Sequence, residues 1–244
     1  MSKHIFWITS YPKSGNTLLR AIISSLFFTN DGKFNFNLLK TINTFENKRR
    51  LDFIKTINPK DFNSLNKLEI LSKYWNKIQS KSNLNFKENM IFIKTHHALV
   101  KYEKIPFAVE EDCRGLMHVV RDPRDVVISW ANHAKISIDK SIDYLTNEFS
   151  GTHWNNHRSS LLPKDIEPLT ILSSWEKNIK SWTESKWKCP QLILRYEDLV
   201  YDKRNSILLI ANFFIEKFNF KFSNLDKKID NIIKTTNFSE LKKI

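Results

Sequence analysis

Glycine, proline and cysteine are all scarce in this 244-residue chain, which has 4, 7 and 2 of them respectively. So little glycine and proline excludes a collagen-like or glycine-rich linker architecture. Two cysteines, Cys113 and Cys189, exclude a secreted scaffold held by several disulfides. No cysteine or histidine pair has the spacing of zinc ligands, and we expect no metal. The hydrophobic fraction of 41% is sufficient for a packed core and argues against wholesale disorder.

Long hydrophobic runs are also missing. No segment reaches the roughly 18 uninterrupted apolar residues of a membrane span, and the opening MSKHIFWITS has no signal-peptide cleavage site. We therefore expect a cytoplasmic protein. Acidic residues are outnumbered, 26 against 39 lysines and arginines, which gives a formal charge of +13. This surplus indicates an anionic partner: a nucleic acid, an acidic surface or a polyanionic small molecule.

Short apolar runs that alternate with helical patterns predict the fold class. Buried strands are expected at residues 4–9, 90–94, 115–120 and 191–195. Helices are expected over residues 18–27, 126–134, 171–187, 206–218 and 225–233. This alternation predicts an α/β, three-layer sandwich with a mostly parallel central sheet.

Two stretches are less regular. Residues 30–90 contain helical patches such as 65–78 but no clear strand, and residues 139–168 read as a polar, irregular insertion. No internal repeat and no sharp change of composition divides the chain. Residues 1–244 are therefore expected to form one domain.

The turn between the first predicted strand and helix has the features of an anion-binding site. Backbone N–H groups from Ser14 to Thr17 lie at a helix N-terminus, where they have no partner in the helix and the helix dipole favours negative charge. Lys13 adds a full positive charge, and Ser14 and Thr17 add hydroxyl donors. The loop does not match the G-x-x-x-x-G-K-[ST] pattern of nucleotide-binding phosphate loops. A basic turn that caps a core helix is the alternative.

Two further strand ends carry candidate residues. His96 follows a predicted strand beside Lys94, and carboxyl ends of parallel strands border the ligand crevice. An imidazole there suits proton abstraction at neutral pH, although spacing alone does not separate His96 from His97. Arg121 follows the next strand, and Ser129 lies in the helix after it. Together they can hold one phosphate from two sides; a surface ion pair of Arg121 with a neighbouring aspartate is the alternative.

In order along the chain, these motifs resemble the cytosolic-type sulfotransferases that use 3′-phosphoadenosine-5′-phosphosulfate (PAPS). Residues 11–17 (YPKSGNT) resemble that family's 5′-phosphosulfate loop, 92–96 (FIKTH) its catalytic-base element and 119–129 (VVRDPRDVVIS) its 3′-phosphate element. Further matches are Ser174-Trp175 with Trp182, residues 194–199 (LRYEDL), and Thr236-Asn237-Phe238. The resemblance covers nearly the whole chain and implies a P-loop NTPase-like fold.

The resemblance also implies roles for individual residues. Sulfuryl transfer from PAPS to a hydroxyl or amine of a small molecule would use His96 as general base, Lys13 at the leaving phosphate and Lys94 at the sulfuryl oxygens. The co-substrate would contact the following residues: Lys13, Ser14, Gly15, Asn16, Thr17, Leu18, Arg121, Ser129, Trp175, Tyr196, Thr236 and Phe238. Residues 30–90 and 139–168 are expected to line the acceptor pocket. Their phenylalanine and tryptophan content allows an apolar alcohol as acceptor; core packing of the same rings is the alternative.

Three departures from the family pattern are visible. Leu18 stands where the family often has a tryptophan that stacks on adenine, and Asn16 stands where threonine or serine is common. No Arg-Lys-Gly segment follows Thr236-Asn237-Phe238, as it usually does in the family. We expect either that other basic residues replace it or that the chain is a shortened member with weakened cofactor affinity.

Three other functions are weighed against sulfotransfer. A shortened, catalytically weak or inactive relative would still bind PAPS or its product. A nucleotide kinase would need a Walker-type loop and magnesium carboxylates, and neither is apparent. A nucleic-acid-binding protein would account for the charge, but the lysines are spread through the chain and no recognised binding motif accompanies them.

Overall fold

The computed structural model describes residues 3–80, 90–152 and 168–237. Its centre is a five-stranded sheet in the order β2-β3-β1-β6-β9, and every neighbouring pair in it is parallel. The strands are β2 (Asn43–Thr44), β3 (Ile91–Thr95), β1 (Ile5–Ser10), β6 (Cys113–Val120) and β9 (Gln191–Arg195). Two small antiparallel pairs lie outside this sheet, β4 (Lys101–Tyr102) with β5 (Ile105–Pro106) and β7 (Gly151–Thr152) with β8 (Thr170–Ile171).

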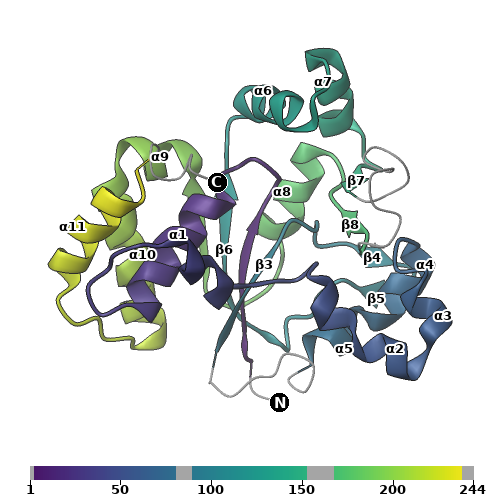
Figure 1. Ribbon diagram of the computed structural model, residues 1–244, viewed down its shortest axis with the longest axis horizontal. Coiled ribbons are helices and arrows are strands. Elements are labelled where there is room, and N and C mark those ends of the chain that lie inside the picture. Colours follow the sequence, from purple (N-terminus) through teal and green to yellow (C-terminus); the bar gives the residue numbers. More distant parts are fainter. Residues whose placement is uncertain (1–2, 81–89, 153–167, 238–244) are drawn as a thin grey trace.

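Helices cover both faces of the sheet (Figure 1). One layer contains α1 (Asn16–Phe28), α9 (Tyr196–Tyr201), α10 (Lys203–Phe218) and α11 (Leu225–Thr235). The opposite layer contains α8 (Trp175–Thr183) and a group of short helices: η2 (Lys48–Leu51), α2 (Phe53–Ile57), α3 (Pro59–Phe62), α4 (Leu68–Leu71), η3 (Ser72–Tyr74) and α5 (Trp75–Gln79). The short helix η1 (Phe36–Thr41) packs against α1. The last pair, α6 (Pro123–Ala134) and α7 (Ile138–Thr146), stands above the carboxyl ends of the strands.

The central strand β1 explains why the sheet needs two layers. All six of its residues are buried, because neighbouring strands flank it and helices cover both of its faces. Phe6 and Ile8 enter the core beneath α1 and α10, whereas Ile5 and Trp7 enter the core on the other side. A strand buried on both faces reads as a continuous apolar run rather than an alternating one.

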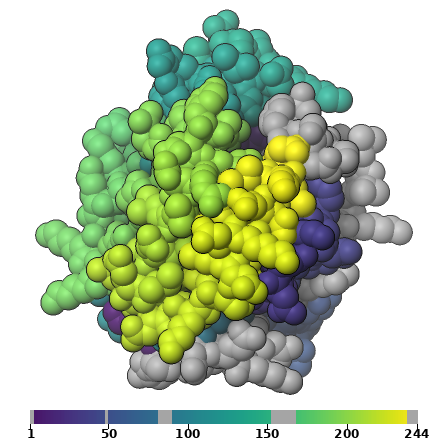
Figure 2. Space-filling view, turned by 90° about the vertical axis from the view of Figure 1, so that its left-hand side faces the viewer, coloured from purple at the N-terminus to yellow at the C-terminus, as the bar shows by residue number. Residues whose placement is uncertain are grey.

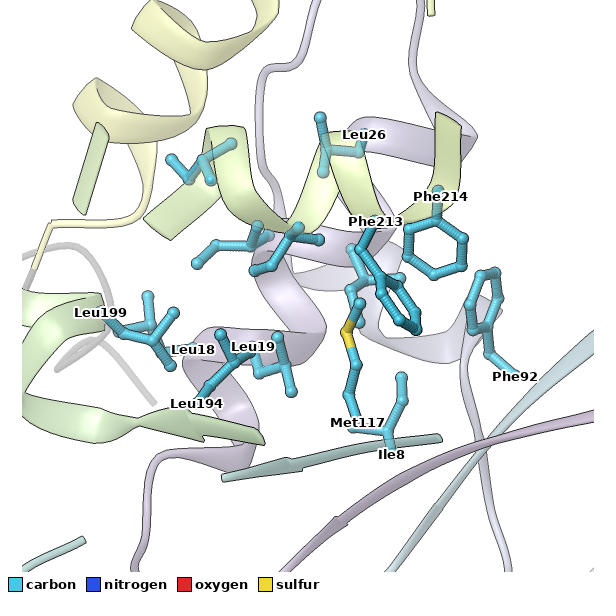
Figure 3. Packing of buried hydrophobic residues seen from close by; sticks show 14 of the residues in the cluster. Ile8, Leu18, Leu19, Leu26, Phe92, Met117, Leu194, Leu199, Phe213 and Phe214 are labelled. Atoms are coloured by element: carbon cyan, nitrogen blue, oxygen red, sulfur yellow. The ribbon is translucent and has the colours of Figure 1, made fainter. Parts of the chain in front are cut away.

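The core beneath α1 and α10, which we call the α1 core, is rich in phenylalanine. Figure 3 shows Phe213 and Phe214 of α10 above Met117 and Ile8 of the sheet, with Leu18, Leu19 and Leu26 contributed by α1. The Phe214 ring lies 4.7 Å from that of Phe27 and 5.0 Å from that of Phe6. Helices α9 to α11 cover most of the corresponding outer face of the molecule (Figure 2).

The core on the other side of the sheet is built around Trp7. Its ring lies 5.8 Å from Phe107 and 6.0 Å from Trp182 of α8. The short helices add Leu51, Ile54 and Trp75 to the same cluster. In the described ranges, no helix combines the length and the apolar character that a membrane crossing requires.

Most of the predicted elements are confirmed. The four predicted strands correspond to β1, β3, β6 and β9, and β9 has the predicted ends. The expectation that residues 30–90 hold no strand is wrong, because β2 pairs with β3 at the sheet edge. Residues 139–168 were predicted to be irregular, and this is wrong for residues 139–146, which belong to the helix α7. The Ser137 side chain caps the N-terminus of this helix. The predicted helix at 171–187 is shorter, because Ser174 caps α8 and the helix ends at Thr183.

Replacing Phe214 by alanine tests the packing of the α1 core. The Phe214 ring is fully buried, so its loss removes apolar contacts and leaves a cavity, and we expect the free energy of unfolding to fall by about 3–5 kcal/mol. Denaturant unfolding measures this change. The matched control is Ile215→Ala on the same helix, whose side chain is 37% exposed; an equal loss in both variants would contradict the assigned packing.

Candidate functional site

The carboxyl ends of β1, β3, β6 and β9 converge, and hydrogen bonds tie them together. At the end of β1, the Ser10 carbonyl accepts a hydrogen bond of 2.7 Å from Nδ1 of His96, which follows β3. Arg121, which follows β6, donates from Nη1 to the Lys13 carbonyl at 3.0 Å. The ring of Tyr196, which follows β9, lies under the Arg121 guanidinium at 4.5 Å. The predicted loop, histidine, arginine and tyrosine therefore form one site.

The loop after β1 has a left-handed backbone at two positions, Lys13 with φ 65° and Gly15 with φ 94°. Glycine adopts this region without a steric penalty. At Gly15 a second constraint applies, because a Cβ atom there would lie 2.2 Å from Cδ2 of Tyr196. The absence of a side chain lets the tyrosine ring pack directly against the loop backbone. Gly15 is thus required both by its backbone conformation and by the close approach of Tyr196.

The N-terminus of α1 carries no side-chain cap, and its N-cap residue is Gly15. The first N–H groups of a helix have no partner within it, and Leu19 is the residue whose N–H closes the first turn, on the Gly15 carbonyl. Beside these groups, the buried Ser14 hydroxyl and Asn16 Oδ1 have no hydrogen-bond partner in the described structure. Unpaired buried polar atoms are costly, so a polar ligand at this helix end would satisfy them. The donor set suits an anion.

Lys13 lies in this loop with its charge near a second cation. Burial and the neighbouring Arg121 lower the pKa of Lys13. A bound anion would offset both effects, because it would supply the opposite charge that the loop lacks.

Two hydrogen-bond partners at the end of β1 orient the His96 imidazole. Its Nδ1 faces the Ser10 carbonyl, which can only accept, so Nδ1 carries the hydrogen and Nε2 is left as the basic nitrogen. The Ser10 hydroxyl lies 3.3 Å from the same Nδ1 and accepts a hydrogen bond from the Asn16 amide. Burial and then the Lys94 charge lower the pKa of His96. Its imidazole is therefore neutral at pH 7, the state a general base needs.

His97 has a different environment. Its Nδ1 accepts a hydrogen bond from the Ile171 N–H at 3.1 Å, and its carbonyl accepts one from the Trp182 indole at 2.8 Å. Its ring stacks on Phe107 at 4.3 Å, and the residue is 1% exposed. Burial lowers the pKa of His97 to about 4. These contacts favour a packing role for His97 and leave His96 as the histidine beside the loop.

Lys94 belongs to β3 and has a carboxylate partner that the sequence analysis missed. Its side chain is 12% exposed, and Nζ lies 3.9 Å from Oε2 of Glu46. Glu46 follows β2, the edge strand that was also missed. A short polar strand gives no apolar run, so its carboxyl end, where Glu46 sits, was not recognised as part of the site.

A cleft of about 300 Å³ opens beside Arg121, lined in part by Trp175, Arg195 and Glu197. Arg121 and Trp175 were predicted, whereas Arg195 was not. Arg195 is the last residue of β9, and Arg121 directly follows β6. The rule that the carboxyl ends of parallel strands border the ligand crevice could therefore have identified Arg195 as it identified Arg121. Ser129 lies in α6, two turns after Arg121, and is half-buried.

Four further residues were predicted to contact the co-substrate: Thr17, Leu18, Thr236 and Phe238. The Leu18 side chain packs in the α1 core, so its backbone N–H is the group available at the helix end, while Thr17 is exposed. Thr236 is buried at the end of α11, where its hydroxyl donates to the Ile232 carbonyl. Phe238 lies outside the described residues. Among the described residues, no group of three histidines, cysteines or carboxylates is placed to hold a metal ion.

Residues 3–244 match a protein family described as "Sulfotransferase domain". The chain belongs to this sulfotransferase family. Its curated relatives include the rabbit (Oryctolagus cuniculus) amine sulfotransferase, 20% identical over 97% of this chain. Another is the mouse (Mus musculus) sulfotransferase 1B1, 26% identical over 96% of this chain. The match covers 62% of the first relative and 64% of the second, so this chain spans less than two thirds of either.

Two solved structures share the fold. Mouse sulfotransferase SULT7A1 complexed with PAP, 16% identical, has a TM-score of 0.56 over 99% of this chain and 66% of its own. Retinol dehydratase with androsterone and the inactive cofactor PAP, 19% identical, has a TM-score of 0.57 over the same shares. The sulfotransferase fold, which is P-loop NTPase-like, confirms the predicted three-layer α/β class with a parallel sheet.

Gly15→Ala tests the contact between the loop and Tyr196. The alanine meets both the left-handed backbone and the tyrosine ring, and the backbone part alone costs about 1–3 kcal/mol of the free energy of unfolding. Denaturant unfolding of the variant measures the loss. In a Tyr196→Ala background, where the ring is gone, the same substitution should cost less. An equal cost in both backgrounds would contradict the ring contact.

Proposed function

We propose that this protein is a PAPS-dependent sulfotransferase. Membership of the sulfotransferase family supports the assignment, as do relatives described as sulfotransferases and solved structures described as complexes with PAP. The single observation that carries it is the joining of two groups in one site. The Ser10 carbonyl holds Nδ1 of His96, and Ser10 ends the strand that leads into the loop with Lys13 and the uncapped helix N-terminus.

The proposed chemistry uses these groups as follows. His96 Nε2 takes the proton of the acceptor hydroxyl or amine while a bond forms from that oxygen or nitrogen to sulfur. The bond from sulfur to the 5′-phosphate oxygen breaks, and its electrons remain on the phosphate. Lys13 and the N–H groups of Gly15 to Leu18 stabilise this growing charge, and Lys94 acts at the sulfuryl oxygens. Positioning and charge stabilisation supply the rate in transfers of this kind.

The adenosine and 3′-phosphate are assigned to the remaining residues. Arg121 and Ser129 would hold the 3′-phosphate, and Trp175 and Tyr196 would frame the adenosine beside the cleft; Thr236 and Phe238 are included by resemblance. The unpartnered indole Nε1 of Trp175, buried beside this cleft, supports a polar ligand there.

The acceptor is proposed to be a small molecule with a hydroxyl or amine. Retinol and androsterone appear in the descriptions of the structural relatives, and an amine sulfotransferase is among the sequence relatives. An apolar alcohol is our preferred class, contacted by residues from 30–90 and 139–168, of which 81–89 and 153–167 lie outside the described residues. We further propose that residues 1–244 act as one domain in the cytoplasm and that the positive charge serves this small-molecule chemistry rather than nucleic acid.

Binding of 3′-phosphoadenosine-5′-phosphate (PAP) tests the donor site. PAP should raise the thermal midpoint in proportion to ln(1 + [L]/Kd). Arg121→Ala should raise the Kd for PAP by about 10- to 150-fold, because a charge-assisted hydrogen bond contributes about 1.5–3 kcal/mol.

Arg124→Ala is the matched control, since Arg124 is exposed and pairs with Asp122. Adenosine 5′-monophosphate, which lacks the 3′-phosphate, should bind wild type and Arg121→Ala with similar Kd values. An equal effect of Arg121→Ala on both nucleotides would argue against a 3′-phosphate contact.

His96→Ala tests the general base. We expect kcat for sulfuryl transfer from PAPS to fall by about 10²- to 10⁴-fold, with the Kd for PAP nearly unchanged. His97→Ala is the comparison, because the contacts of His97 are those of packing. It should lower the thermal midpoint, while kcat measured well below that midpoint should stay close to the wild-type value. The opposite pattern, a stable but inactive His97→Ala and an active His96→Ala, would reverse the assignment.

A further inference from the structure

Glu46 contacts both Lys94 and His96 of the proposed reaction centre, although it belongs to none of the sequence motifs. One carboxylate oxygen, Oε1, accepts a hydrogen bond of 2.6 Å from the Thr95 hydroxyl and one of 3.2 Å from the His96 backbone N–H. The other oxygen, Oε2, lies 3.9 Å from Nζ of Lys94. The side chain is 13% exposed. A single carboxylate thus contacts three consecutive residues at the end of β3.

Cationic side chains from three elements interact with this carboxylate. Lys94 faces it from β3, Arg20 from α1 and Arg50 from η2, and the rings of His96 and His97 lie nearby. Arg20 is bound to the Leu39 carbonyl at 2.6 Å. Glu46 is therefore paired with Lys94, and its charge also raises the pKa of Arg20 and of Arg50.

The charge balance gives Glu46 a definite effect on its neighbours. Burial raises the pKa of a carboxyl, but Lys94 and the other groups outweigh it, and the pKa of Glu46 lies below its ordinary value. In return, Glu46 raises the pKa of Lys94 against the opposing effects of burial and Arg20. It raises the pKa of His96 against burial and Lys94.

We propose that Glu46 is a positioning residue for sulfuryl transfer, fixing the His96 backbone with one oxygen and keeping the Lys94 ammonium in place and charged with the other. The inference rests on the proposed function and deepens it. Glu46 acts through His96 and Lys94. Its Oε1 fixes the backbone of His96 and so the orientation of the imidazole, and its Oε2 provides the negative charge opposite the Lys94 ammonium, which is assigned to the sulfuryl oxygens.

A role confined to stability would show no change in the pH dependence of kcat, so that dependence is the chosen readout. Glu46→Gln keeps an oxygen for the Thr95 and His96 hydrogen bonds and removes the charge. Without the charge, the pKa of Lys94 falls, and the ammonium is lost at lower pH. The basic limb of kcat against pH should move down by about one unit, a typical effect of a nearby opposite charge. The acidic limb should move in the same direction, because the pKa of His96 also falls.

The expected change of kcat at neutral pH is a decrease of about tenfold, within the range for directly contacting residues. In a Lys94→Met background, Glu46→Gln should change kcat less than it does in wild type. Glu69→Gln, at an exposed carboxylate on α4, is the matched control and should leave both limbs in place.

The outcomes separate the inference from the function it rests on. Absence of transfer from PAPS by the wild-type protein would refute the proposed function itself. Transfer by wild type with unmoved limbs in Glu46→Gln would overturn the role of Glu46 alone. Should Glu46→Gln not fold, Glu46→Asp keeps the charge and shortens the reach. It should lower kcat at a similar thermal midpoint, and an unchanged kcat would overturn the proposal.

Discussion

The hydrogen bond between the Ser10 carbonyl and His96 Nδ1 is the contact on which the site depends. It joins the end of β1 to the end of β3, and β1 passes directly into the anion-binding loop. It also fixes the tautomer of the imidazole, so that the basic nitrogen faces away from the strand that holds it. Loop geometry and proton-transfer geometry are therefore set by one interaction, and neighbouring parallel strands maintain its length.

The parts of the fold that could be predicted from sequence are those in which local pattern and tertiary burial agree. β1 is apolar because both of its faces are covered, and β3 and β6 stood out for the same reason; β9 lies at the sheet edge and is largely unburied, but its apolar run QLILR still stood out in the sequence. β2 has two polar residues at an edge and leaves no such signal. The helix α7 was missed because its polar residues outnumber its buried ones, and only Ser141 and Leu145 are buried.

The same distinction applies to the site. Lys13, His96 and Arg121 follow recognisable strands, so their convergence could be expected from the rule that parallel strands end at one edge. Glu46 could not be expected in this way, because its importance comes from partners 48 to 50 positions later in the chain. The choice between His96 and His97 likewise required the hydrogen bonds of each ring. Sequence patterns identify which chemical groups are available, whereas the three-dimensional contacts decide their protonation and direction.

The packing of Tyr196 on Gly15 has a consequence for the order of assembly. The loop belongs to the first tenth of the chain, yet its shape is completed by a ring that lies about four fifths of the way along. During synthesis on the ribosome, a nascent polypeptide would carry the proposed phosphate-binding segment long before the residue that shapes it has been made. Under the proposed function, donor recognition is thus a late event in biogenesis, and a product released before the last strand of the sheet would contain the motif without the ring that shapes it.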